Sequence, residues 1–254
     1  MSGYRTAMRT HAGHVRALNE DSAMMLPERG LWAVADGMGG HHRGDHASSL
    51  VTSRLASLAR TASGRDLFRA VAAGLDGCHR ELKAAGTDGE ICGCTVVVLL
   101  ASVGRFACLW AGDSRLYLLR AGKLRQLTRD DSLVQELIDR AELHPAAARS
   151  HPWRNMITRA VGVGQHLELG TVQDSIQPGD RFLLCTDGLT GEVEDEVIEA
   201  VLASTAVDVA ADRLLALTLT RSARDNVTLV VIDVDDAGAP APDRRSEPAP
   251  AMGD

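Results

Sequence analysis

Residues 32–41 of the chain read WAVADGMGGH. The run begins as a short apolar strand without alternating polar residues, continues into Asp36, and then has three glycines within four positions. A carboxylate at the end of a buried strand, beside residues that allow close backbone approach, can bind a hard cation through oxygen. The dipeptide Asp36-Gly37 is also typical of a hairpin turn, which is the commoner explanation for such a pair on its own. The stretch therefore predicts a buried strand and leaves two explanations for its end.

The composition is that of one soluble domain. The chain has 254 residues, of which 45% are hydrophobic, so it can bury a sizeable core. We expect a catalytic domain over residues 1–235 and a disordered Ala/Pro-rich tail over residues 236–254. The net charge of −7 and the lack of a Lys/Arg block argue against binding to nucleic acid or to an anionic membrane.

The N-terminus lacks the charged-then-apolar pattern of a secretion signal, and no apolar run reaches the roughly 18 residues that span a bilayer. An odd number of cysteines, five, also argues against a disulfide framework. We therefore expect a cytoplasmic protein without a membrane anchor, and we expect it to be a monomer.

Hydrophobic periodicity predicts an α+β protein. Helices are expected at residues 45–60 (with Asp45 as N-cap), 67–86, 130–140, 194–202 and 207–220. Strands are expected at 5–11, 24–26, 31–35, 95–103, 105–111, 114–120, 123–127, 168–175, 181–185 and 227–234. Turn glycines every 8 to 10 residues between 95 and 127, without an intervening helix, predict an antiparallel meander. Residues 141–166 are polar and irregular, which is typical of a lid beside a site.

Four aspartates flank predicted strands: Asp36, Asp113, Asp187 and Asp225. Our hypothesis is that an antiparallel sandwich gathers them at one edge. Clustered carboxylates repel one another unless cations bind or their pKa values shift, and oxygen-only ligands favour magnesium or manganese. Two such ions about 4 Å apart would suit in-line displacement at phosphorus. Arg16 could add a bidentate phosphate clamp.

Eight runs of the sequence, in order and covering roughly residues 10–234, resemble the bacterial branch of the metal-dependent protein phosphatases, the protein phosphatase 2C-like (PPM) family. They are VRALNEDS (15–22), WAVADGMGGH (32–41), GCTVVVLL (93–100), WAGDSRLYLLR (110–120), LTRDDSLVQELI (127–138), HPWRNMITRAVG (151–162), LLCTDGLT (183–190) and RDNVTLVVI (224–232). The resemblance implies a four-layer α-β-β-α sandwich, two antiparallel sheets flanked by helices. It also implies a serine/threonine phosphoprotein phosphatase that acts on phosphorylated proteins and opposes a cognate Ser/Thr kinase.

The resemblance further implies two Mn²⁺ or Mg²⁺ ions. Asp36 would bridge both ions and the Gly37 carbonyl would bind one of them, while Asp187 and Asp225 would complete the ligands of the other. A third, weaker ion would bind at Asp113.

Three further regions match positions with a role in the family. Glu20 and Asp21 match residues that hold metal-bound water, and Arg16 matches the phosphate-binding arginine. Residues 130–166 correspond to the flap, which the family links to substrate choice.

The sequence departs from many eukaryotic relatives at Met38, where those proteins have a histidine proposed as general acid. His41 and a metal-bound water are the two remaining candidates for the proton donor. Two other functions stay open: an inactive phosphoprotein-binding module of the same fold, and a phosphatase for small phosphate esters. The intact aspartates argue against the first. No cysteine has an arginine at the spacing of a cysteine-dependent phosphatase, and Asp233 with Asp235 is interpreted as a solvated strand end.

Overall fold

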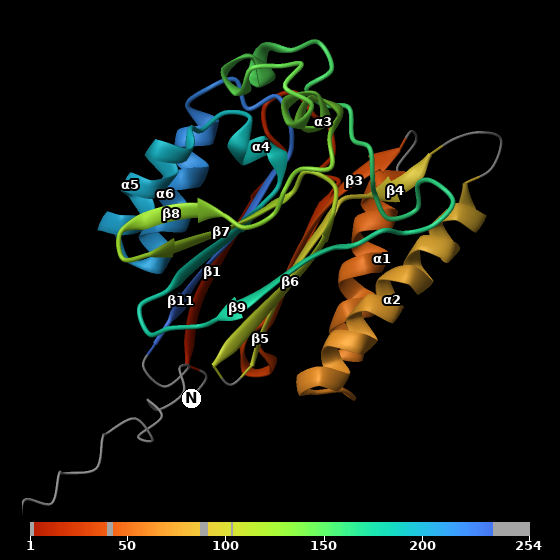
Figure 1. Ribbon diagram of the computed structural model, residues 1–254, viewed down its shortest axis with the longest axis horizontal. Helices are drawn as coiled ribbons and strands as arrows, with labels where there is room; N and C mark the ends of the chain where they lie inside the picture. Colours follow the sequence, from red (N-terminus) through yellow and green to blue (C-terminus); the bar gives the residue numbers. More distant parts are fainter. Residues whose placement is uncertain (1–2, 40–42, 87–90, 103, 236–254) are drawn as a thin grey trace, which may run out of the picture.

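The computed structural model describes residues 3–39, 43–86, 91–102 and 104–235 (Figure 1). The expected tail, 236–254, and His41 lie outside the described residues. The strands are β1 (Tyr4–His11), β2 (Asp21–Leu26), β3 (Leu31–Gly39), β4 (Cys92–Cys94), β5 (Val96–Ser102), β6 (Arg105–Ala111), β7 (Arg115–Arg120), β8 (Lys123–Gln126), β9 (Gly170–Ser175), β10 (Arg181–Cys185) and β11 (Val227–Val234). The helices are α1 (Arg43–Leu58), α2 (Gly64–Ala85), α3 (Leu133–Asp139), α4 (Asp187–Thr190), α5 (Asp195–Ser204) and α6 (Val207–Leu219), with short 3₁₀ turns at Pro27–Arg29 and Pro145–Ser150.

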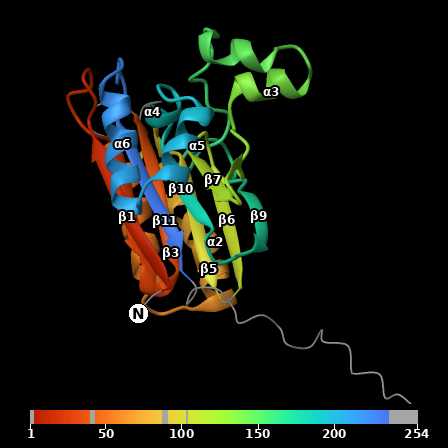
Figure 2. The ribbon, with the colours of Figure 1, turned by 90° about the vertical axis from the view of Figure 1, so that its left-hand side faces the viewer.

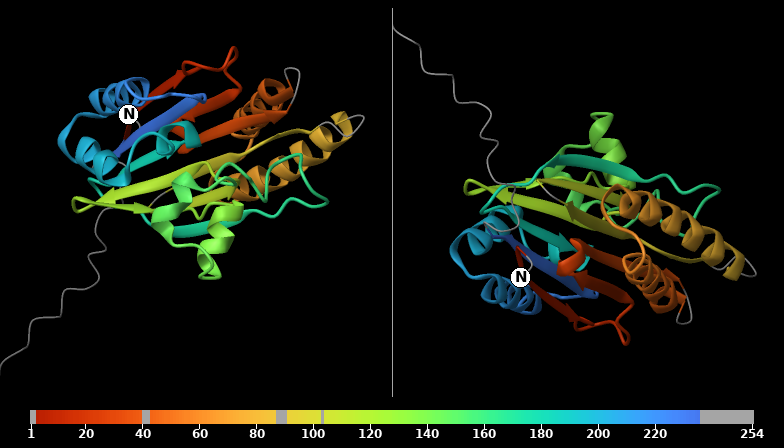
Figure 3. Two further views of the ribbon diagram at one scale, coloured as in Figure 1. Left: turned by 90° about the horizontal axis from the view of Figure 1, so that it is seen from above. Right: turned by 90° about the horizontal axis from the view of Figure 1, so that it is seen from below.

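The strands form two sheets that pack face to face between two pairs of helices. One sheet has the order β1-β11-β10-β7-β8, and the other has the order β2-β3-β5-β6-β9 with β4 paired to β3. Every pairing between these strands is antiparallel. Figures 1 and 3 show α5 and α6 outside the first sheet and α1 and α2 outside the second. The expected four-layer α-β-β-α sandwich is therefore confirmed.

The apolar run that begins the central strand is explained by burial on both faces of β3. Trp32 and Val34 pack between the sheets, whereas Leu31, Ala33 and Ala35 pack under the helices. A strand that is buried on both sides has no polar face, so its sequence does not alternate. This arrangement places β3 inside its sheet, between β2 and β5.

Three expectations about these elements were wrong. Strand β3 does not end at Asp36 but continues to Gly39, because residues 37–39 pair with β4. Asp45 is not the N-cap: α1 begins at Arg43, and Asp45 lies in its first turn. Asp233 is not solvated, because it is 8% exposed and Arg181 donates two hydrogen bonds to its carboxylate.

The predicted meander is also divided between the two sheets. β5 and β6 form a hairpin in one sheet, whereas β7 and β8 form a hairpin in the other. The chain crosses from the first hairpin to the second at residues 112–114, next to the end of β3 that carries Asp36. The crossing therefore brings Asp113 to the edge where both sheets meet the site.

None of the helices in the described ranges combines the length and apolar character that crossing a bilayer requires.

Candidate metal and phosphate site

The acidic residues predicted from the sequence come together at one end of the sandwich, from both sheets. In the second sheet, Asp21 of β2 lies directly opposite Asp36 of β3. In the first sheet, Asp187 follows β10 as the first residue of α4, and Asp225 precedes β11. Asp113 lies in the crossing segment and is 7% exposed. Like charges directly opposite in a sheet are destabilising, so stability alone does not account for this arrangement.

Two glycines allow the backbones to approach closely enough to form the cluster. A Cβ atom on Gly37 would lie 2.1 Å from the Gly44 carbonyl oxygen and 2.6 Å from that of Glu20. A Cβ atom on Gly188 would lie 1.9 Å from the carbonyl oxygen of Asn226. In both Asp-Gly pairs the glycine is therefore required by packing against a neighbouring segment. The hairpin turn that Asp36-Gly37 suggested does not form, because both residues lie within β3.

The carboxylates repel one another strongly. Burial raises the pKa of Asp36 well above its usual value, and the charges of Asp21, Asp187, Asp113 and Asp225 raise it further. Burial is also the main reason that the pKa of Asp21 rises to about 7, with a smaller opposing effect from hydrogen bonding to hydroxyl groups.

The remaining two buried carboxyls behave in the same way. Burial and the charge of Asp225 raise the pKa of Asp187 to about 6, and a hydrogen bond with Asp36 offsets part of this rise. Burial and the charge of Asp187 raise the pKa of Asp113 well above its usual value. The four carboxyls would each be stabilised by nearby positive charge.

The donor atoms fit divalent cations. One side-chain oxygen on each of Asp21, Asp113 and Asp187 is buried without a hydrogen-bond partner among the described residues. In the same part of the chain no three His, Cys, Asp or Glu side chains form a ready-made metal site by themselves. This is compatible with magnesium-like ions, which keep several waters and are bound through one or two carboxylates. The unpartnered carboxylate oxygens and the raised pKa values therefore favour cation binding.

Arg16 lies beside the cluster on an exposed loop. Its Nη2 donates a hydrogen bond of 2.8 Å to Oδ2 of Asp225, and half of its side chain is exposed. Hydrogen bonding to Asp225 raises the pKa of Arg16, so the guanidinium stays charged. The arginine thus places a positive charge at the mouth of an otherwise acidic site.

Asn226 holds the Arg16 loop in place, a role that the sequence did not indicate. Its Oδ1 accepts the backbone N–H of Glu20 at 2.8 Å, and its Nδ2 donates to the carbonyls of Ala12 and Leu18 at 2.9 Å. The side chain is nearly buried, 5% exposed. The sequence shows a polar residue, Asn226, between Asp225 and the apolar run of β11, and this could have marked it as a candidate. It does not indicate which groups Asn226 would contact.

Hydroxyl groups position Asp21. Thr186 donates from Oγ1 to Oδ2 of Asp21 at 3.0 Å, so the last residue before α4 in one sheet orients a carboxylate of the other. Glu20 contributes to the site through its backbone, because its carbonyl accepts the N–H of Gly37 and the hydroxyl of Ser48.

The adjacent pair Asp130 and Asp131 joins the flap to the sandwich. Arg115 of β7 donates to both oxygens of Asp130, with Nη2–Oδ2 at 2.6 Å. Asp131 accepts the N–H of Gly112 at 3.0 Å and is paired with Arg159 at the far end of the flap. Both aspartates lie within the run 127–138, and nothing in the sequence indicates their role.

The flap, residues 130–166, stands above this end of the sandwich, and Figure 2 shows α3 projecting beyond the sheets. A cavity of about 150 Å³ lies between flap and cluster, and Asp113, Asp187, Arg154 and Asn155 are among its lining residues. Arg154 forms no ion pair with any residue that the structure describes.

A second groove, of about 470 Å³, continues from Asn155 to Met38. It collects three of the six large hydrophobic side chains that are exposed in the described ranges: Ile91, Trp153 and Met156, each about half exposed. The flap therefore forms an apolar surface beside the acidic cluster.

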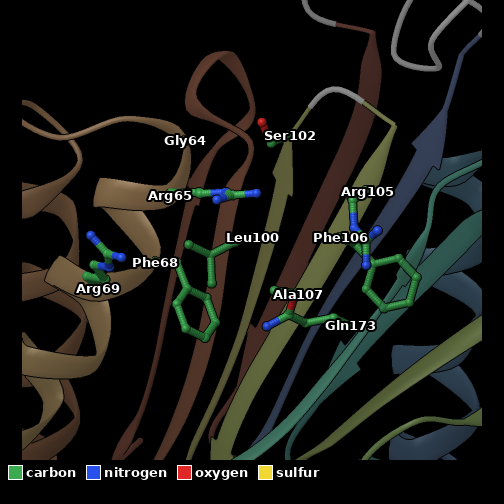
Figure 4. Close-up of a pocket in the computed structure, with 10 residues that line it drawn as sticks. All are labelled: Gly64, Arg65, Phe68, Arg69, Leu100, Ser102, Arg105, Phe106, Ala107 and Gln173. Carbon is green, nitrogen blue, oxygen red and sulfur yellow. The ribbon is translucent and has the colours of Figure 1, made fainter.

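A third cavity lies away from the acidic cluster. It has a volume of about 610 Å³, is formed by α2, β5, β6 and β9, and contains none of the predicted site residues (Figure 4).

Comparison with known proteins gives a consistent result. A profile of the family described as protein phosphatase 2C matches residues 10–221. The serine/threonine protein phosphatase PstP of Mycobacterium tuberculosis is 42% identical over 236 residues, which is 91% of this chain and 45% of that protein. The chain thus spans about half the length of this curated relative.

Two solved structures are similar over nearly their whole length. PppA, a key regulatory component of T6SS in Pseudomonas aeruginosa, superposes with a TM-score of 0.80 at 41% identity, covering 91% of this chain and 97% of that chain. The catalytic domain of PstP in complex with two manganese ions superposes with a TM-score of 0.81 at 39% identity, covering 92% and 99%.

Proposed function

This chain belongs to the protein phosphatase 2C family, and on that premise we propose that it is a serine/threonine phosphoprotein phosphatase that depends on two manganese or magnesium ions. One observation carries the proposal. Four buried carboxylates from both sheets, Asp21, Asp36, Asp113 and Asp187, converge, none of them forms an ion pair with a residue that the structure describes, and their pKa values are raised. An inactive binding module would gain nothing from maintaining this repulsion.

The proposed ligands are those that the family resemblance implies, and the convergence of these residues supports them. Asp36 would contact both ions, with the Gly37 carbonyl on one ion and Asp187 and Asp225 on the other. Asp113 would hold a third, weaker ion. When bound, two divalent ions would neutralise phosphoryl oxygens and lower the pKa of the attacking water.

The protein's own groups would bind and orient the phosphate. Arg16 uses one N–H group on Asp225, and the other N–H groups of its planar guanidinium can pair with phosphate oxygens. Glu20 and Asp21 would orient water at the cluster, with Asp21 held by Thr186.

Met38 cannot supply the proton for the leaving oxygen. Its thioether sulfur carries no dissociable proton. The Met38 side chain lines the groove beside the acidic cluster. We propose that solvent at the site protonates the serine or threonine oxygen as it leaves.

The substrates would be phosphorylated proteins, with a cognate Ser/Thr kinase as the opposing enzyme. The relative in P. aeruginosa is a key regulatory component of T6SS, and a signalling role of this kind is compatible with the proposal. We place the reaction in the cytoplasm, where thiols stay reduced, because all five cysteines are free and buried.

The test is phosphate release from a phosphothreonine peptide with manganese, with EDTA, and with the Asp36→Asn variant. We expect turnover with manganese alone. Absence of turnover in folded, manganese-loaded wild-type protein would contradict the proposal and favour the binding module.

A further inference from the structure

The cavity in Figure 4 is distinct from the catalytic end of the molecule. It lies where the first turns of α2 meet the far end of β5, whereas the other end of β5 adjoins Asp36, whose carbonyl accepts the N–H of Thr95. Five residue steps separate Thr95 from Leu100, the first residue of β5 in the cavity lining, which at roughly 3.3 Å per step is about 16 Å. A ligand in this cavity would not contact the carboxylate cluster.

Three arginines surround the cavity: Arg65 and Arg69 of α2, and Arg105 at the start of β6. The first two are four residues apart and so lie on one face of the helix. None of the three has an ion pair or a side-chain hydrogen bond with a residue in the described ranges, and no acidic side chain lines the cavity. By contrast, Arg54 of the neighbouring helix is paired with Glu81.

The three arginines form a local excess of positive charge in a chain whose net charge is −7. Three guanidinium groups around one hollow repel one another and would be stabilised by an anion. Arginine forks match phosphate oxygens in geometry as well as charge.

The floor of the cavity is apolar. Figure 4 shows Phe68 and Leu100 close together beneath Arg65, with Gln173 reaching toward them from β9. The hollow is thus bounded by a helix on one side, the sheet beneath and β9 opposite. Its volume of about 610 Å³ is within the range of about 300–1,000 Å³ that is usual for small-molecule sites.

We propose that this cavity binds a nucleoside polyphosphate. The phosphates would pair with the three arginines, and the base would pack on Phe68 and Leu100 with Gln173 available for hydrogen bonding. Each part of such a ligand meets a matching surface, since the charges form the rim and the apolar groups form the floor.

The test is calorimetric titration of the full chain with ATP in the presence of EDTA, so that no divalent ion attracts phosphate to the acidic cluster. We expect saturable binding with a 1:1 stoichiometry. Arg105→Glu should weaken it by about tenfold, because a charge-assisted contact is worth about 1.5 kcal/mol or more. Arg213→Glu, an exposed position on α6 with the same change of net charge, is the matched control and should bind as the wild type does.

Inorganic tripolyphosphate distinguishes a nucleotide site from a general anion site. We expect ATP to bind more tightly than tripolyphosphate. Absence of ATP binding, equal loss of binding in Arg105→Glu and Arg213→Glu, or equal affinity for ATP and tripolyphosphate would each overturn the proposal. Arg65→Glu and Arg69→Glu repeat the test on α2. Hydrolysis of p-nitrophenyl phosphate with manganese, unchanged in every variant, verifies folding and is independent of the nucleotide result.

Discussion

Replacing Asn226 by alanine should uncouple the Arg16 loop from the sandwich. The substitution removes three hydrogen bonds, one from the N–H of Glu20 and two to the carbonyls of Ala12 and Leu18. At roughly 1 kcal/mol each, their loss should lower the free energy of unfolding by about 2 to 3 kcal/mol. Solvent can reach Leu18, which is 43% exposed, so a larger loss is not expected.

The same variant should lose activity, because Arg16 would no longer be held beside Asp225. A misplacement of about 1 Å can cost up to about 100-fold in rate, so we expect kcat/KM for p-nitrophenyl phosphate to fall by at least about tenfold. Urea unfolding and steady-state kinetics with saturating manganese measure the two effects separately.

A double-mutant cycle with Arg16→Ala tests whether Asn226 acts through the arginine. If it does, Asn226→Ala should reduce activity much less when Arg16 is already absent, because coupled residues are not additive. Full additivity, or wild-type kcat/KM in Asn226→Ala despite lower stability, would refute the reasoning.

Three further predictions concern the cluster and the flap. Asp36→Asn and Asp225→Asn should each abolish turnover while circular dichroism shows an intact fold; a wild-type rate in either variant with manganese would show that the assigned ligand is wrong. In EDTA, the melting temperature should rise as the pH is lowered from 8 to 5. The folded-state pKa values of Asp21 and Asp187, about 7 and about 6, exceed the usual 3.8, so in this pH range the folded state binds more protons than the unfolded state. The stability gained by this proton binding is lost as the pH rises through these two pKa values. Manganese should reverse this trend, since metal binding requires deprotonated carboxylates, and a flat or falling melting temperature on acidification in EDTA would contradict the raised pKa values. Trp153→Ala should raise KM for phosphopeptides with apolar residues near the phosphate and leave p-nitrophenyl phosphate hydrolysis unchanged. Val209→Ala, at an exposed apolar position away from the groove, is the control. Equal effects of Trp153→Ala on both substrates would contradict a role of the groove in peptide binding.

The elements that could be predicted from sequence are those whose signal is local. The bounds of β6, β10 and β11 agree with the predicted ones, because the strand pattern of each is carried by its own residues. The change of sheet between β6 and β7 could not be predicted. A turn glycine has the same sequence pattern whether the following strand pairs with the preceding one or joins the other sheet. Asp233 was misjudged for a similar reason, because its partner Arg181 is 52 residues away.

The acidic cluster was predicted as a set of residues, but its structural support was not. Each Asp-Gly pair was visible in the sequence, whereas the reason for the glycine is a contact with another segment: Gly37 with Glu20 and Gly44, and Gly188 with Asn226. Likewise, the hydrogen bonds of Asn226 and Asp131 join segments far apart in the chain. The metal-binding roles remain predictions that the variants above test.

The carboxylates come from two sheets, and this has a consequence for how activity can change. Asp36 belongs to one sheet and Asp225 adjoins the other. The distance between their carboxylates therefore depends on the thickness of the hydrophobic layer between the two sheets. Phe106 and Phe182 meet edge to face in that layer, with ring centroids 5.0 Å apart. A larger or smaller side chain there would alter the spacing of the site without touching it. Variants with altered metal preference can therefore arise from the interior of the protein, far from any residue that a survey of the active site would select.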